Sequence, residues 1–195
     1  QQAYGAYIYG DSTCGQHAFY DVIQSGVPVI NVNNNCSSGS TAIFMARQAV
    51  LSGEADCVLA FGFEEMQPGA LGSHWSDRED PFNRCEQIMD KFDVPPGPVA
   101  LRAFGGAGRF YMDKYGVEAD IFAKVAAKSR SHAIKNPYSL FNQPLTWQQV
   151  LGDKVVFDGY LTRLMACPPT CGAAASIICS ESFARKHGIN DEVKI

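Results

Sequence analysis

The first part of the chain alternates short apolar runs with segments in which apolar residues recur every three or four positions. Three apolar runs are typical of β-strands, at residues 5–10, 28–33 and 56–63. Between them the pattern predicts two helices that each stop at a glycine, at about 12–25 and at 38–52. This βαβαβ order favours a mostly parallel sheet with crossover helices. The unbroken run "DCVLAFGF" further indicates a strand that is buried on both faces.

Two predicted helices carry an apolar stripe along one face. In the helix at 38–52 the stripe consists of Ala42, Ile43, Ala46, Ala49 and Val50. A later helix, predicted at 118–135, has a similar stripe of Ile121, Phe122, Val125, Ala126 and Ala133. We expect both stripes to be buried.

The middle of the chain interrupts the alternation. Residues 67–100 are rich in proline, glycine and charge, and a loop of that length is usually functional or forms a small subdomain. Helices are predicted after it at about 102–115, 118–135 and 147–151, the last one beginning with a Thr146–Gln149 capping box. A strand at 172–180 and a helix at about 181–187 resume the first pattern. The prediction is therefore a core formed by residues 1–66 and 166–195, with an inserted helical domain at 67–165.

Composition excludes several classes of protein. Hydrophobic residues make up 46% and charged residues 18% of the chain, and the net charge is -4, as in ordinary soluble globular proteins. The sixteen Lys and Arg residues are scattered, so no nucleic-acid partner is indicated. No apolar run approaches the ~20 residues that a membrane helix needs. We expect an intracellular protein without a membrane span.

The seven cysteines are an odd number in a chain of this size and do not indicate a disulfide scaffold, so a reducing, intracellular setting fits better. Cys57 and Cys179 lie inside apolar runs, where a thiol usually behaves as a small hydrophobe. Cys167 and Cys171, in "CPPTC", have no second Cys or His pair at matching spacing, so no metal site is predicted.

Cys36 stands out because it follows three asparagines between a predicted strand and a predicted helix, in "PVINVNNNCSSGS". Asparagine tolerates the left-handed backbone that a tight corner requires. The unpaired N–H groups and positive dipole end of the next helix favour an anion such as a thiolate. The Cys36 N–H can also donate to an oxyanion that forms when the sulfur attacks a carbonyl. A buried structural thiol is the alternative interpretation.

Two segments around this corner carry a family resemblance. "NVNNNCSSGSTAIFMARQAV" and "GEADCVLAFGFEEM" strongly resemble the nucleophile region of thiolases, above all the sterol carrier protein x type (SCP2-thiolases) and bacterial homologues labelled lipid-transfer proteins. "YGDSTCGQ", "KYGVEADIFAKVAAKSRSHAIKNPYSLF" and "LTRLMACPPTCGAAASIICSESFARKHG" extend the resemblance over nearly the whole chain.

The resemblance implies an α/β protein of the thiolase fold, whose αβαβα layers are built from two βαβαβαββ halves, each with a mixed sheet. This chain would hold most of the first half, with residues 67–165 as the loop domain that covers the active site. Cys36 would be the nucleophile that cleaves a 3-oxoacyl-CoA, with coenzyme A as co-substrate and with no permanent cofactor or metal. The substrates imply degradation of fatty acids, branched chains or sterol side chains. A homodimer, joined near the strand at 28–33, is also implied, in the cytoplasm of a bacterium or the peroxisome of a eukaryote.

Other site residues are less clearly indicated. Phe104, at the start of "FGGAG", would line the acyl pocket, whereas the glycines alone match a phosphate loop only weakly. Some of the five cations Arg78, Arg84, Lys91, Arg102 and Arg109 would contact CoA phosphates. The Glu64–Glu65 corner would support the site, and Cys171 would be a turn variant.

The chain opens without a start methionine and stops at "EVKI", so we expect it to belong to a longer protein. The family's activating histidine and second cysteine would lie in the other half, and none of His17, His74, His132 and His187 has a matching context. Residues 1–195 alone would then be inactive. Two alternatives stay open: a thiolase-fold retro-aldol lyase of steroid side-chain degradation, and a non-catalytic lipid-binding protein.

Overall fold

The computed structural model describes residues 12–22, 26–68, 76–190 and 193–195. The chain divides into two compact units. The sheet unit consists of residues 1–78 and 170–195, and the helical unit of residues 79–169. The predicted strand at 5–10 lies outside the described residues.

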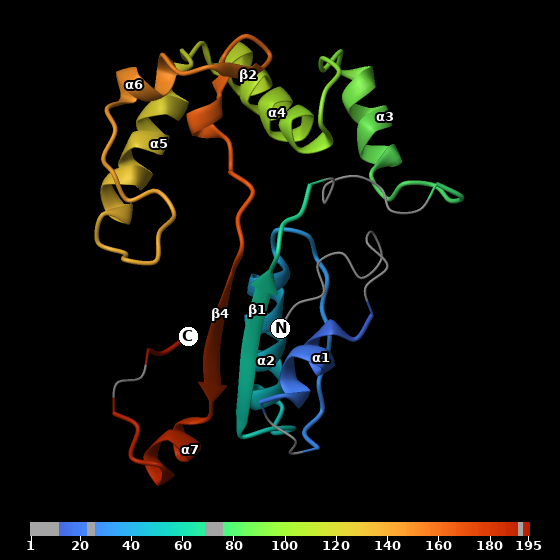
Figure 1. Cartoon of the computed structure of the whole chain (residues 1–195), viewed down its shortest axis with the longest axis vertical. Coiled ribbons are helices and arrows are strands. Elements are labelled where there is room, and N and C mark those ends of the chain that lie inside the picture. The colour runs from blue at the N-terminus through green and yellow to red at the C-terminus, as the bar shows by residue number, and fades with distance from the viewer. Residues whose placement is uncertain (1–11, 23–25, 69–75, 191–192) are drawn as a thin grey trace. The chain divides into compact units, whose positions relative to one another are not determined.

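The sheet unit pairs two eight-residue strands. Its elements are α1 (Cys14–Tyr20), α2 (Ser38–Leu51), β1 (Cys57–Glu64), β4 (Gly172–Cys179) and α7 (Glu181–Lys186), as Figure 1 shows. This confirms four predicted elements within a residue or two: the strands at 56–63 and 172–180, and the helices at 38–52 and 181–187. The helix predicted at about 12–25 is shorter, since α1 ends at Tyr20.

The predicted mostly parallel sheet is wrong for the described strands, because β1 and β4 run antiparallel. Their register extends from the pair Cys57 and Cys179 to the pair Glu64 and Gly172. The last residue of β1 therefore lies opposite the first residue of β4. A strand that returns from an excursion to the same end of its neighbour must run antiparallel to it.

Residues 28–33 do not form the predicted strand. Side-chain hydrogen bonds instead attach this segment to α1. The Asn31 amide nitrogen donates to the Gln16 side-chain oxygen over 2.6 Å, and the Gly15 N–H donates to Asn31 Oδ1 over 2.8 Å. Gln16 Nε2 donates in turn to the Val29 carbonyl over 3.1 Å. Apolar alternation indicated a strand, but a strand also needs a ladder partner, and this segment has none among the described residues.

The core of the sheet unit lies between α2 and one face of the sheet. Ala42 and Ala46 of α2 pack on Ala60 of β1, with Val58 and Ile178 beside them. The buried stripe on α2 is narrower than predicted, because Ile43 is exposed. Small alanines allow the helix to approach the strand closely.

The other face of β1 is only partly covered, which corrects the prediction of a strand buried on both faces. Successive residues of a strand point to opposite faces. Phe61 packs against Phe19 of α1, with ring centroids 5.1 Å apart, whereas Leu59 on the same face is exposed. Cys57, two residues before Leu59, is exposed as well.

The helical unit contains four helices and a short hairpin. They are α3 (Asn83–Lys91), α4 (Val99–Tyr115), α5 (Asp120–Ala133), α6 (Trp147–Leu151), β2 (Val155–Phe157), β3 (Leu161–Thr162) and the 3-10 turn Arg163–Met165. The three helices predicted in this region are confirmed, as is the capping box of Thr146 and Gln149. The stripe on α5 is partly wrong: Ala123 is fully buried and Val125 is exposed.

The glycines of "FGGAG" lie inside α4 and allow close packing. A Cβ at Gly105 would overlap the Phe157 ring, and a Cβ at Gly108 would overlap the Tyr160 hydroxyl. The Tyr160 hydroxyl donates to the Gly105 carbonyl over 2.7 Å. Helix–hairpin packing therefore accounts for this glycine cluster.

Candidate active site at the Asn34–Ser38 corner

A left-handed residue forms the turn that leads into α2. Asn35 has a φ of 47°, a conformation that asparagine adopts more readily than most residues. Ser38, buried at the first position of α2, bridges the turn. Its hydroxyl accepts from the Asn34 N–H over 2.8 Å and donates to the Asn35 carbonyl over 2.8 Å. This serine is a positioning residue that the sequence interpretation did not single out.

Further hydrogen bonds fix Asn34. Its carbonyl accepts from both the N–H and the hydroxyl of Ser37, over 3.0 and 2.8 Å. Its side-chain amide donates to Thr41 Oγ1 over 3.1 Å, and that hydroxyl donates to the Ser37 carbonyl over 2.9 Å. The corner is therefore held by side chains on both sides of Cys36.

Cys36 lies at the tip of this corner, two residues before α2 begins, and is exposed. Its N–H donates no backbone hydrogen bond among the described residues. The first turn of α2 contains no acidic residue. The helix thus carries no acidic side chain of its own at its positive end, where an anionic sulfur or an oxyanion is favoured.

The end of β1 carries the predicted Glu64–Glu65 corner. The Glu65 N–H donates to the Glu64 carboxylate over 3.1 Å, and the Gln67 amide donates to the Glu65 carboxylate over 2.9 Å. The thiol of Cys171 lies 4.0 Å from the Met66 carbonyl oxygen, next to the start of β4. Cys171 therefore lies beside the segment that follows β1, and its role as a turn variant stays a prediction.

Phe104, the predicted acyl-pocket residue, lies on α4 in the helical unit, with 75% of its surface exposed. Its role in substrate contact stays a prediction.

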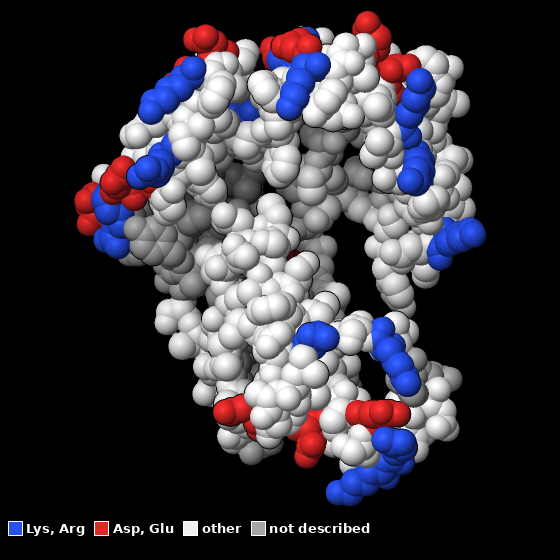
Figure 2. Space-filling model, turned by 180° about the vertical axis from the view of Figure 1, so that it is seen from behind, with Lys and Arg blue, Asp and Glu red and all other residues white. Residues whose placement is uncertain are grey.

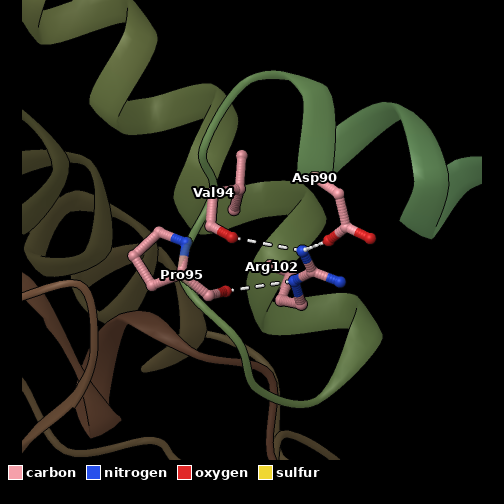
Figure 3. Close-up of polar contacts among 4 residues, drawn as sticks. All are labelled: Asp90, Val94, Pro95 and Arg102. Atoms are coloured by element: carbon pink, nitrogen blue, oxygen red, sulfur yellow. Dashed lines mark hydrogen bonds and ion pairs between the residues drawn. The ribbon is translucent and has the colours of Figure 1, made fainter.

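Arg102 proves to be a structural cation. Only 8% of its side chain is exposed. As Figure 3 shows, its Nη2 contacts Asp90 at 2.5 Å and donates to the Val94 carbonyl over 3.1 Å, while Nε donates to the Pro95 carbonyl over 3.0 Å. These bonds hold the end of α3 and the following loop against α4, so Arg102 is committed to this internal network.

Arg109 is similarly engaged. It donates to the carboxylate and the carbonyl of Asp158 over 2.9 and 2.6 Å, and the hydrogen bond with that carboxylate raises the pKa of Arg109. Arg78 pairs with Asp77, and this contact lowers the pKa of that carboxyl. On the face that Figure 2 shows, Lys and Arg are interspersed with Asp and Glu. Of the five proposed phosphate contacts, only Arg84 and Lys91 have no ion-pair partner among the described residues.

Within the described ranges, no three His, Cys, Asp or Glu side chains are grouped so that they could hold a metal ion. No helix there has the length and apolar character needed to cross a membrane. His17 and His132 lie on α1 and α5, and His187 packs against Phe183 with the ring centroids 4.3 Å apart. His74 lies outside the described residues.

Known proteins resemble this chain over most of its length. Residues 10–163 match the family described as "Thiolase, N-terminal domain". "Sterol carrier protein 2" of Gallus gallus is 47% identical over 194 residues, which are 98% of this chain and 35% of that protein. "Benzoylsuccinyl-CoA thiolase subunit BbsB" of Thauera aromatica is 31% identical over 93% of this chain and 45% of that protein. The chain thus spans about a third of the sterol carrier relative's length.

A solved structure, "Ltp2-ChsH2(DUF35) aldolase", has a TM-score of 0.62 at 20% identity, over 80% of this chain and 38% of that one. This likeness concerns the fold. The mixed α/β fold, the family match and the sterol carrier relatives agree: the chain belongs to the thiolase family, in which it represents the N-terminal domain and is similar to the sterol carrier protein 2 type.

Proposed function

We propose that the full-length protein cleaves a 3-oxoacyl-CoA by CoA-dependent thiolysis through an acyl-enzyme on Cys36. The single observation that carries the proposal is an exposed thiol on a left-handed corner, braced by Ser38, at the start of a helix. Most structural thiols are buried and serve packing. Cys36 is exposed and lies outside the described core, but four other cysteines are exposed as well, so the corner rather than exposure alone distinguishes it.

In the first step the Cys36 sulfur attacks the 3-keto carbon. The carbon–carbon bond then breaks, acetyl-CoA leaves (propionyl-CoA from a 2-methyl substrate) after its carbanion takes up a proton, and the shortened acyl group stays on sulfur. In the second step the thiolate of another CoA attacks this thioester and releases the shortened acyl-CoA. Covalent catalysis divides one difficult cleavage into two easier transfers.

The corner supplies two further features to this reaction. The Cys36 N–H and the positive end of α2 can stabilise the oxyanion that each attack produces. Removal of one such donor commonly costs about a hundredfold or more in rate. The activating base and the second catalytic cysteine are expected from the other half of the fold, so residues 1–195 alone should be inactive.

The test compares the full-length protein with its Cys36→Ala and Cys85→Ala variants. Cys85 is also an exposed thiol, but no left-handed residue precedes it, so it serves as the matched control. The assay follows loss of the absorbance of the 3-oxoacyl-CoA–magnesium complex, and mass spectrometry locates the trapped acyl group. We expect Cys36→Ala to lower the rate by at least about a thousandfold and Cys85→Ala to leave it unchanged.

Turnover by the Cys36→Ala variant would refute the nucleophile assignment. If that variant still cleaved a 3-hydroxyacyl-CoA into an aldehyde or ketone and an acyl-CoA, the retro-aldol alternative would replace the thiolase proposal. The aldolase with the similar fold motivates this control, whereas the intact Cys36 corner favours thiolysis. Binding of acyl-CoA without any turnover would instead favour a lipid-binding role.

Three properties accompany the proposal as predictions. The protein would be a homodimer, it would use coenzyme A as co-substrate without a permanently bound cofactor, and it would reside in the cytoplasm of a bacterium or the peroxisome of a eukaryote. The predicted loop-domain role of the inserted segment belongs to the same proposal. Phe104 would contribute to the acyl pocket from that segment.

A further inference from the structure

Two cysteines lie directly opposite each other at one end of the β1–β4 ladder. Cys57 is the first residue of β1, and its register partner is Cys179, the last residue of β4. One step beyond this pair, the Ser180 N–H donates to the Asp56 carbonyl over 2.9 Å. Asp56 and Ser180 are therefore a hydrogen-bonded pair, and antiparallel pairs alternate between hydrogen-bonded and non-hydrogen-bonded types. It follows that Cys57 and Cys179 form a non-hydrogen-bonded pair.

This pair type brings side chains closest together. Opposite Cα atoms in non-hydrogen-bonded pairs are about 4.5 Å apart, and disulfides typically join Cα atoms about 4.4–6.8 Å apart. A bond between the two sulfurs therefore needs little backbone movement. Two effects raise the pKa of Cys57. The larger is burial of its thiol, and the smaller is the charge of the neighbouring Cys179.

Both thiols lie on the face of the sheet that α2 does not cover. Val58 and Ile178, the next residues inward, pack against the α2 core, so the cysteines beside them point to the opposite face. On that face Cys57 is exposed and Cys179 is partly exposed. The proposal requires that a small-molecule oxidant also reach the pair in the full-length protein.

We propose that Cys57 and Cys179 are a redox modification site, which a low-molecular-weight disulfide such as oxidised glutathione converts into a cross-strand disulfide. The thiolate of Cys57 attacks one sulfur of the oxidant, and one glutathione thiolate leaves. The thiolate of Cys179 then attacks the Cys57 sulfur of the mixed disulfide, and the second glutathione leaves. Two protein thiols are oxidised and one glutathione disulfide is reduced, and the two protons that the protein thiols lose are taken up by the two leaving glutathione thiolates.

The second step is intramolecular, which favours the cross-strand disulfide over the mixed one. A thiol held opposite its partner acts at a high effective concentration. The product links the first residue of β1 to the last residue of β4. The covalent loop that it closes therefore contains the whole helical unit. A cross-link across so long a loop restricts the unfolded ensemble and raises thermal stability. Reduction of the bond by the glutathione pool makes the effect reversible, as is usual for disulfides in reducing compartments.

The experiment incubates the full-length protein in buffers of increasing ratio of oxidised to reduced glutathione, followed by acid quench, alkylation and tryptic digestion without reduction. Cys57 is the only cysteine between Arg47 and Arg78, whereas Cys179 shares its tryptic peptide with two other cysteines, Cys167 and Cys171. Fragment ions from the linked peptides identify the bonded cysteine. We expect the Cys57–Cys179 link at a glutathione ratio about tenfold lower than the ratio that glutathionylates exposed Cys85.

A thermal scan supplies the second measurement. The oxidised protein should unfold at a higher temperature than the reduced protein, and dithiothreitol should abolish the difference. Cys179→Ser is the matched control, because it keeps the side-chain size and leaves Cys57 able to form only a mixed disulfide. A link from Cys57 to Cys167 or Cys171, a persistent mixed disulfide in the unchanged protein, or no link where Cys85 is modified would overturn the proposal.

The geometric argument has its own control. In a Cys57→Ser, Cys179→Ser background, Leu59→Cys with Ile177→Cys rebuilds a pair at the next non-hydrogen-bonded position of the same face. This pair should link under the same conditions. If it links and the natural pair does not, the natural pair is not a modification site.

Discussion

Replacement of Gly105 by alanine tests how the helical unit is held together. Phe157, which is 6% exposed, lies with one ring edge against Gly105 and the other against Gly97. A Cβ at Gly105 would stand 2.8 Å from ring atom Cε1 and closer still to Cδ1, and a Cβ at Gly97 would stand 3.3 Å from Cε2. The ring therefore has little room to move away from a new methyl group.

Two effects of opposite sign determine the magnitude. Alanine in a helix interior is more favourable than glycine by about 1 kcal/mol. A methyl group forced into a packed site costs about 1–3 kcal/mol, and the wedged ring places this case near the upper end. We therefore expect Gly105→Ala to lower the free energy of unfolding of the helical unit by about 2 kcal/mol.

Urea denaturation followed by the fluorescence of Trp147 measures this change, because Trp147 lies on α6 within the same unit. The second tryptophan, Trp75, is replaced by phenylalanine throughout. Ala107→Gly, at an exposed position of α4, calibrates the helix propensity and should cost about 1 kcal/mol. In a Phe157→Leu background the cost of Gly105→Ala should fall below about 0.5 kcal/mol. A Gly105→Ala protein as stable as the unchanged one would refute the packing argument.

Substitutions at two further positions test the buried phenol and the corner. Burial, with a smaller contribution from Asp158, raises the pKa of Tyr160, so the unfolded chain loses this proton first and stability falls as pH rises above about 10. Tyr160→Phe should cost about 1 kcal/mol at pH 7 and less above pH 10, and an equal urea-denaturation deficit at both pH values would contradict the shift. Asn35→Ala should cost about 1 kcal/mol, whereas Asn35→Gly should stay near the unchanged protein, because only the first strains the left-handed backbone. Urea denaturation and the iodoacetamide reaction rate of Cys36 would show this, and equal effects of the two changes would argue against it.

Elements with strong local signals were predictable from the sequence. The helix α2, the strand β1 and the capped helix α6 follow from apolar spacing and terminal residues, which act over a few positions. The helix α3 was not predicted, since its nine residues are mostly polar and none is buried. The hairpin of β2 and β3 was missed because its strands have only three and two residues.

Pairing between distant segments was not predictable in the same way. The antiparallel pairing of β1 with β4 depends on where the long excursion ends, and no local pattern records that position. The partners of Arg102 and Arg109 likewise come from packing. Arg109 pairs with Asp158, which is 49 positions away, so its sequence neighbours gave no sign that it was engaged. The engagement of these two cations in ion pairs was therefore not predicted.

The corner at Cys36 lies between these two cases. Three asparagines, small residues and an adjacent helix start are local signals, and they correctly indicated a left-handed turn, here at Asn35. The bridging role of Ser38 is also local, but any serine near a helix start would have looked the same in the sequence. What makes this serine different is that it is buried while the neighbouring thiol is exposed. A corner that is fixed by a buried serine can hold a reactive thiol at the surface. The buried Ser38 beside the exposed Cys36 thus connects the local sequence pattern to the proposed chemistry.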